Sequence, residues 1–240
     1  MSSRNLSTHL VHMKKDKAVV LLSGGLDSCV VTAIAQQDYQ VCLLHVNYGQ
    51  RTYVREEKAF KDIAAHYNIS QILNVDISYL LEIGGSSLTD ERITIPDYSA
   101  DKEIPSTYVP FRNANLLSIA TSWAEAIGAK KIFIGAMEED SNGYPDCRES
   151  FLVAFNKTIE QGTKPKTKIS VEAPLLHKKK SEVVTIGKEL HAPLHLTWSC
   201  YQNSEKACGI CESCKMRIKA FKDAGFADAI PYTIQISWKD

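Results

Sequence analysis

The stretch VVLLSGGLDSCV (residues 19–30) joins a buried strand to a helix through a glycine-containing turn. The aliphatic run before Ser23 is typical of a strand that is covered on both faces. Backbone amides at the start of a helix are free to bind an anion, and glycine lets phosphate oxygens approach closely. Ser23 and Ser28 add hydroxyl donors. The turn is therefore a candidate phosphate site, and a tight turn in which Asp27 only caps the helix is the alternative.

The motif in this turn differs from the common phosphate loop, because no Gly-Lys-Ser/Thr sequence follows the glycines. Ser-Gly-Gly-Leu-Asp-Ser after a first strand instead resembles the pyrophosphate loop of the ATP pyrophosphatases. Members of that superfamily cleave ATP between the α- and β-phosphates and adenylate their substrates. The residues that this resemblance implies in ATP binding are Leu22, Ser23, Gly24, Gly25, Leu26, Asp27 and Ser28.

The segments around the turn alternate between strand and helix patterns. Strands are predicted at 18–22, 39–49, 71–77, 130–136 and 169–175, and helices at 26–37, 53–67, 112–127, 149–161 and 178–190. This alternation is typical of an α/β fold with a doubly wound, mainly parallel sheet and flanking helices. The fold is expected to be like that of the adenine-nucleotide α-hydrolases. The segment 78–108 is rich in Gly, Ser, Thr, Asp and Pro and is predicted to be a long loop.

Length and composition indicate one main domain with a small appendage. The chain has 240 residues, of which 44% are hydrophobic. Lys+Arg and Asp+Glu number 28 each, which argues against a protein that coats nucleic acid. The lack of an apolar run of about 18 residues argues against a membrane span. The predicted division is a tail at 1–16, an ATP-pyrophosphatase α/β domain at 17–190, and a four-cysteine segment with a closing helix at 191–240.

Four of the seven cysteines gather near the C-terminus in the pattern C-x7-C-x2-C-x2-C, namely Cys200, Cys208, Cys211 and Cys214. In a chain without an export signal, this clustering favours metal ligation in a reducing cytoplasm over disulfides. Four thiolates can close a tetrahedral site around one structural Zn²⁺ ion. The alternatives are an iron–sulfur cluster and four unrelated buried cysteines. Cys29 and Cys42 are interpreted as core residues.

Four further motifs extend the resemblance to most of the chain. They are VNYGQR (46–51), YVPFRN (108–113), YPDCR (144–148) and TWSCY (197–201). Together with the glycine turn and the four cysteines, in this order, they closely resemble the 7-cyano-7-deazaguanine synthase family of queuosine biosynthesis over residues 17–221. One position departs from that pattern, because Thr52 stands where a histidine is expected. This departure puts the role of position 52 in doubt.

The resemblance implies a ligase that converts 7-carboxy-7-deazaguanine and ammonia to the nitrile with two ATP, each accompanied by Mg²⁺. A carboxylate is a poor electrophile, so its oxygen must first become an acyl-adenylate that ammonia converts to an amide. A second adenylation would then activate the amide oxygen for loss of water. The expected partners are therefore small molecules, with no nucleic acid and no membrane, in the cytoplasm. A homodimer is left open.

The residues expected to be catalytic are Asp27, Arg112, Asp146 and Arg148. Arg112 is placed to meet anions, and its alternative is a solvated arginine at a helix start. Asp146 and Arg148 flank Cys147 after the fourth strand, where open α/β sheets bind ligands. Asp146 is expected to accept the ring N–H and the amine of the deazaguanine. A local salt bridge is the alternative for both flanking residues, and adenylation requires no nucleophile at Cys147.

Other titratable residues are interpreted as structural. The lysines at 178–180 are expected to form a solvated helix start, while His45 and His66 are expected to pack in the core or lie at the surface. Two rival functions remain open. One is a tRNA thiolation or lysidine-type enzyme, which would need a basic RNA-binding face. The other is a cysteine module for interaction with nucleic acid or protein, carried on an α/β domain.

Overall fold

Strand β1 (Lys17–Leu21) lies at the centre of a five-stranded sheet in the computed structural model, which describes residues 15–90, 92–94, 104–138 and 144–238. The other strands are β2 (Gln40–Asn47), β3 (Ile72–Asp76), β4 (Lys131–Phe133) and β5 (Ser170–Glu172). They lie in the order β3-β2-β1-β4-β5, and every pairing is parallel. The predicted doubly wound parallel fold is therefore confirmed. Residues 1–14 of the predicted tail lie outside the described residues.

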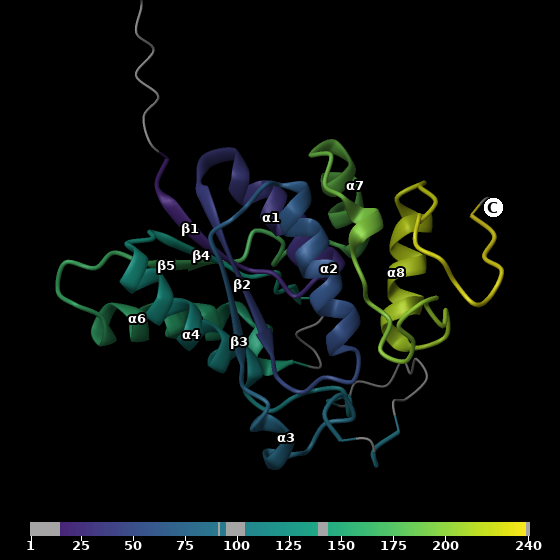
Figure 1. Cartoon of the computed structure of the whole chain (residues 1–240), viewed down its shortest axis with the longest axis horizontal. Helices are drawn as coiled ribbons and strands as arrows, with labels where there is room; N and C mark the ends of the chain where they lie inside the picture. The colour runs from purple at the N-terminus through teal and green to yellow at the C-terminus, as the bar shows by residue number, and fades with distance from the viewer. Residues whose placement is uncertain (1–14, 91, 95–103, 139–143, 239–240) are drawn as a thin grey trace, which may run out of the picture.

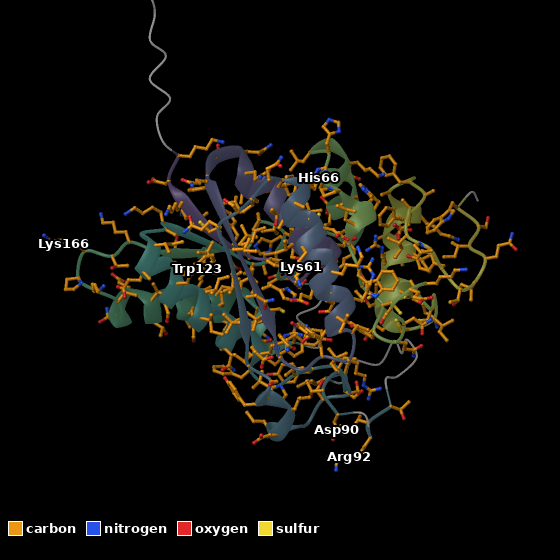
Figure 2. All side chains as sticks on the ribbon, viewed as in Figure 1. Lys61, His66, Asp90, Arg92, Trp123 and Lys166 are labelled. Atoms are coloured by element: carbon orange, nitrogen blue, oxygen red, sulfur yellow. The ribbon has the colours of Figure 1, made fainter. Side chains whose placement is uncertain are left out.

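Helices cover both faces of the sheet because β1 is apolar on both. Ala18 and Val20 pack in one cluster with α1 (Leu26–Asp38), α2 (Tyr53–His66) and α7 (Lys180–Glu189). Val19 and Leu21 pack in the other cluster with α4 (Arg112–Ile127) and α6 (Glu149–Gly162). Figure 1 shows α4 and α6 on one side of the sheet and α1, α2 and α7 on the other. Side chains fill both layers, whereas the labelled Asp90, Arg92 and Lys166 lie at the periphery (Figure 2).

The elements differ from the sequence prediction mainly at the later strands and in the long loop. Strands β4 and β5 have three residues each, fewer than the seven predicted for each. The segment predicted as a loop contains a short helix, α3 (Leu80–Ile83), and residues 91 and 95–103 of that segment lie outside the described residues. Helix α4 ends, as predicted, at residue 127, and its C-cap, Gly128, has a left-handed φ of 72°. Short 3₁₀ helices follow at η1 (Pro145–Cys147) and η2 (Leu194–Leu196).

A buried ion pair links separate parts of the C-terminal segment to one another. Helix α8 (Glu212–Asp223) carries Arg217, which is 2% exposed. Its Nε and Nη2 donate to Asp228 at 2.6 and 3.0 Å, and its Nη1 donates to Thr197 at 2.8 Å. A buried guanidinium is tolerated only when it is fully paired in this way. Phe221 of the same helix lies in the cluster formed by α1, α2 and α7.

The strand order favours a ligand site at the carboxyl ends of β1 and β4. The chain moves from β1 outward to β2 and β3, then returns past β1 to β4 and β5. The loops after β1 and β4 therefore diverge to opposite faces, and open α/β sheets bind ligands in the crevice between such loops. None of the helices in the described part of the chain is both long and apolar enough to cross a membrane.

Candidate active site and metal centre

A cavity of about 700 Å³ opens at the carboxyl ends of β1, β2 and β4. The residues that line it from the turn after β1 are Leu22, Ser23, Gly25, Leu26, Asp27 and Ser28. Gly135 after β4, Lys180 of α7 and Arg112 of α4 also line it, together with residues of the C-terminal segment such as Trp198 and Arg217. The cavity thus lies at the point that the topology predicts and joins segments from the whole chain.

Hydrogen bonds between its own residues shape the turn after β1. The amide of Ser23 donates to Ser28 Oγ at 3.2 Å, the two hydroxyl oxygens are 3.1 Å apart, and the amide of Gly25 donates to Ser23 Oγ at 3.1 Å. The N-cap of α1 is Gly25, and no side chain caps this helix end. The alternative in which Asp27 caps the helix is therefore wrong. Residues in the first turn of α1 line the cavity, and the amides of a first turn have no partner within the helix, which suits an anion site.

Gly24 has a different role from the other residues of the turn. Its φ of 92° is left-handed, and a Cβ atom there would lie 2.6 Å from the carbonyl oxygen of Glu56. Its own carbonyl accepts the amide of Trp198 at 2.8 Å. It does not line the cavity among the described residues. Gly24 therefore lets the turn pack against α2 and the C-terminal segment, and its predicted contact with ATP stays a prediction.

The substitution Gly24→Ala is expected to lower the free energy of unfolding by about 2–4 kcal/mol, from left-handed strain plus the clash with backbone. Gly25→Ala is the matched control, because its Cβ would meet only the Ser23 hydroxyl at 3.2 Å and the Trp198 carbonyl at 3.7 Å. Urea unfolding of both variants measures the difference. Equal destabilisation of the two variants would contradict the tight contact between Gly24 and α2.

Asp27 and Lys180 form an ion pair inside the cavity. Lys180 Nζ lies 2.7 Å from Asp27 Oδ2, and the two side chains are 17% and 23% exposed. The second oxygen, Asp27 Oδ1, is buried without a hydrogen-bond partner in the described part of the chain. Lys178 and Lys179 are exposed, as predicted for a solvated helix start, but this interpretation is wrong for Lys180. Sequence spacing gave no signal for this contact, because the partners are 153 residues apart.

Arg112 meets Tyr48 at the cavity wall. Its Nη1 donates to the Tyr48 hydroxyl at 3.1 Å, and its guanidinium lies 5.2 Å from the centre of the Tyr48 ring. Burial raises the pKa of Tyr48 to about 12, so its hydroxyl keeps its proton at neutral pH. Burial lowers the pKa of Arg112, but the neighbouring Tyr48, Tyr144 and Asp146 raise it by more. The net shift is upward, so the guanidinium stays charged. This part of the cavity therefore offers a cation and a hydroxyl donor to an anionic group.

The three residues of the motif after β4 lie in different environments. Asp146 is buried, and its Oδ2 accepts the amide of Asn113 at 2.8 Å in the first turn of α4. Cys147 lines the cavity, and the side-chain amide of Asn113 lies 3.3 Å from its Sγ. Arg148 is exposed at the start of α6. Neither Asp146 nor Arg148 lines the cavity in the described structure, so their catalytic roles stay predictions and the geometry lends them no support.

His45 and His66 take the structural places that were expected. His45 is buried, stacks on Phe60 with ring centres 4.8 Å apart, and makes a 2.9 Å hydrogen bond from Nδ1 to the Leu22 carbonyl. Burial lowers the pKa of His45. Because a carbonyl only accepts, Nδ1 carries the proton. His66 is exposed near the end of α2 (Figure 2).

The four C-terminal cysteines come together as a candidate metal centre. Cys200, Cys208, Cys211 and Cys214 are all buried, and their Sγ atoms lie within 4.8 Å of one another. The Cys208 and Asn203 amides donate to Cys200 Sγ at 3.3 Å. The Cys211 and Cys214 thiols, together with these amides, hold the pKa of Cys200 below its ordinary value. A set of buried thiols prepared in this way could bind a metal ion. Cys29 and Cys42 lie in the core, as predicted.

Comparison with known proteins identifies close relatives. The family model described as queuosine biosynthesis protein QueC matches residues 17–225. A protein named 7-cyano-7-deazaguanine synthase from Chlorobium chlorochromatii is 56% identical over 220 residues, which cover 90% of this chain and 96% of that relative. One of the same name from Chloroherpeton thalassium is 53% identical over 226 residues, which cover 92% of this chain and 99% of that relative.

The structure was also compared with solved structures. The U34-tRNA thiolase NcsA from Methanococcus maripaludis, solved with its 4Fe–4S cluster, aligns with a TM-score of 0.46 and 17% sequence identity. The alignment covers 79% of this chain and 61% of that chain.

Proposed function

The chain belongs to the family of the queuosine biosynthesis protein QueC, and from that premise we propose that it is an ATP-dependent carbon–nitrogen ligase. Its substrates would be 7-carboxy-7-deazaguanine and ammonia, and its product the nitrile 7-cyano-7-deazaguanine. The observation that carries this proposal is that one and the same cavity is lined by the pyrophosphate-loop turn, Arg112 and Tyr48. Such a cavity can hold a nucleotide and a second anionic substrate side by side.

The residues of the turn supply what adenylation of a carboxylate requires. The free amides in the first turn of α1 and the hydroxyls of Ser23 and Ser28 would hold the phosphates of ATP, and Lys180 would offset the charge that develops on the departing pyrophosphate. Arg112 and the Tyr48 hydroxyl would orient the carboxylate of the deazapurine. Positioning the carboxylate oxygen against the α-phosphate removes much of the entropic cost of the reaction. Ammonia then attacks the acyl-adenylate to give the amide, and the same turn would serve the second activation.

Asp27 would help to hold the Mg²⁺ that accompanies ATP. Its Oδ2 pairs with Lys180, but the buried Oδ1 has no partner in the described part of the chain, which is costly for a carboxylate oxygen. Carboxylate oxygens are preferred ligands of Mg²⁺, which usually keeps several waters and binds substrate phosphates as well. When bound, the ion would neutralise charge on the phosphates.

The four-cysteine centre would hold one structural Zn²⁺ ion. Four sulfurs that surround one ion tetrahedrally at about 2.3 Å lie about 3.8 Å from one another. The Sγ atoms of Cys208 and Cys214 are 3.8 Å apart, and all four lie within 4.8 Å of one another. An iron–sulfur cluster places several irons between its cysteines and needs wider spacing. A closed site with four protein ligands leaves no position for substrate, and a reducing cytoplasm suits its free thiols.

The proposed function is tested by incubating the purified protein with the deazapurine acid, ammonium and Mg-ATP. The expected products are the nitrile, detected by mass, with AMP and pyrophosphate formed in a ratio of about two per nitrile. Omitting ammonium should stop formation of both amide and nitrile. Release of ADP and phosphate instead of AMP and pyrophosphate, or no nitrile with a metal-loaded protein, would contradict the proposal.

A further inference from the structure

The cavity contains a carboxylate, Glu56, that the activation chemistry above does not use. Glu56 lies in the first turn of α2 and lines the cavity together with Gln50 and Tyr48. Its backbone carbonyl lies against Gly24, so α2 begins directly beside the pyrophosphate-loop turn. A carboxylate repels phosphate, and Glu56 is therefore unsuited to bind the phosphates of ATP. It needs a ligand that offers hydrogen-bond donors.

Two buried residues hold the Glu56 carboxylate in one orientation. Thr52 Oγ1 donates to Oε1 at 2.7 Å, and Gln50 Nε2 donates to Oε2 at 3.0 Å. Thr52 and Gln50 are each 5% exposed. The Gln50 amide cannot be flipped, because its own Oε1 accepts the amide of Tyr48 at 3.0 Å. Each carboxylate oxygen thus has one donor from the protein and keeps acceptor capacity, since a carboxylate has about four lone-pair sites.

Two acceptors side by side match a guanine-type edge better than the other ligands of the reaction. A deazaguanine presents a ring N–H and an exocyclic amine next to each other, and both are donors. Adenine presents its amine beside an acceptor nitrogen, which a carboxylate would repel. Arg112 lines the same cavity and adds the complementary positive charge. Burial raises the pKa of Glu56, whereas the hydrogen bonds from Thr52 and Gln50 and the charge of Arg112 lower it. A deazaguanine ring held between Glu56 and Arg112 would direct its ring N–H and amine to the Glu56 carboxylate. Its own carboxylate would then face the Arg112 guanidinium.

We propose that Glu56 is the specificity-determining residue for the deazapurine and accepts its ring N–H and 2-amino hydrogens, with Gln50 and Thr52 as positioning residues. This inference rests on the function proposed above. It gives the departure at position 52 a role, since the Thr52 hydroxyl orients the carboxylate. It also assigns ring recognition to Glu56 in place of Asp146, whose carboxylate accepts the Asn113 amide at the start of α4.

The test is Glu56→Gln, which keeps the shape but turns an amide donor toward a substrate donor. Steady-state kinetics would vary the deazapurine acid, ATP and ammonium in turn. The KM for the acid should rise about 10- to 100-fold, while the KM values for ATP and ammonium stay within about twofold. The wild type should prefer the acid over its 2-deamino analogue by about tenfold or more, and the variant should lose most of that preference. A purely structural role of Glu56 would not change the preference.

Glu57→Gln is the matched control, because Glu57 is the next residue of α2 and pairs with Lys61 and Asn74 outside the cavity. Its kinetics should equal those of the wild type. If Glu56→Gln does not fold, Glu56→Asp, which withdraws the carboxylate by one methylene, takes its place. An unchanged preference, a defect confined to ATP or ammonium, or the loss of preference in Asp146→Asn instead would overturn the assignment. An inactive wild type would contradict the proposed function itself.

Discussion

Replacing Lys180 by methionine is expected to lower kcat/KM for ATP-dependent turnover by about 10²–10³-fold, the loss typical of removing one charge-stabilising group from an active site. Lys180 is the cation that pairs with Asp27 inside the cavity, where the low dielectric strengthens its attraction for phosphate. Methionine keeps most of the side-chain volume but leaves Asp27 without its positive partner. The Asp27 carboxylate would then face the phosphates of ATP directly.

The control for this substitution lies in the same helix start. Lys178→Met removes an exposed lysine that pairs only loosely with Glu182, at 4.0 Å, and should leave kcat/KM within about twofold. Steady-state kinetics with ATP and with the deazapurine acid, together with the thermal unfolding midpoint of both variants, make the comparison. A Lys180→Met enzyme that keeps wild-type kcat/KM would remove Lys180 from the proposed chemistry. A defect that follows the unfolding midpoint would instead point to a structural pair.

The second large effect is expected from Cys211→Ser in the candidate metal centre. Cys211 is 0% exposed, belongs to the four-cysteine set and is also the N-cap of α8. Because metal binding contributes directly to folding free energy, we expect a loss of about 4 kcal/mol or more and a fall of about 10 °C in the unfolding midpoint. Activity should fall as well, because α8 contributes Met216 and Arg217 to the cavity wall.

Metal content separates this role from ordinary core packing. The wild type should carry about one zinc per chain and be colourless, whereas Cys211→Ser should lose most of the metal. Cys42→Ser is the matched control, since Cys42 is equally buried in β2 but lies outside the cluster, and it should keep the metal even if its stability falls. A Cys211→Ser protein with full zinc content and an unchanged midpoint would refute the structural centre. A brown wild type rich in iron would favour a cluster.

Local patterns in the sequence were sufficient to predict the order of the elements, the turn after β1 and the four-cysteine cluster. They were not sufficient to predict which other side chains line the cavity. The candidate phosphate turn is recognisable because its glycines and serines are neighbours in the chain. The candidate metal centre is recognisable because its four cysteines are closely spaced. The apolar run of β1 predicts a central strand, since burial on both faces requires it. These features depend on residues close together in sequence, so a single chain displays them.

Only the tertiary structure decided which side chains meet in the cavity. Lys180 reaches Asp27 across 153 residues because α7 packs beside α1, a contact that no local spacing encodes. Asp146 follows β4 where a ligand residue is expected, yet the start of α4 lies close enough for the Asn113 amide to bind its carboxylate. The first turn of α2, brought against Gly24, presents Glu56 instead. The direction of a polar side chain depends on which donors the packed elements bring within hydrogen-bonding distance, and that arrangement exists only in the folded chain.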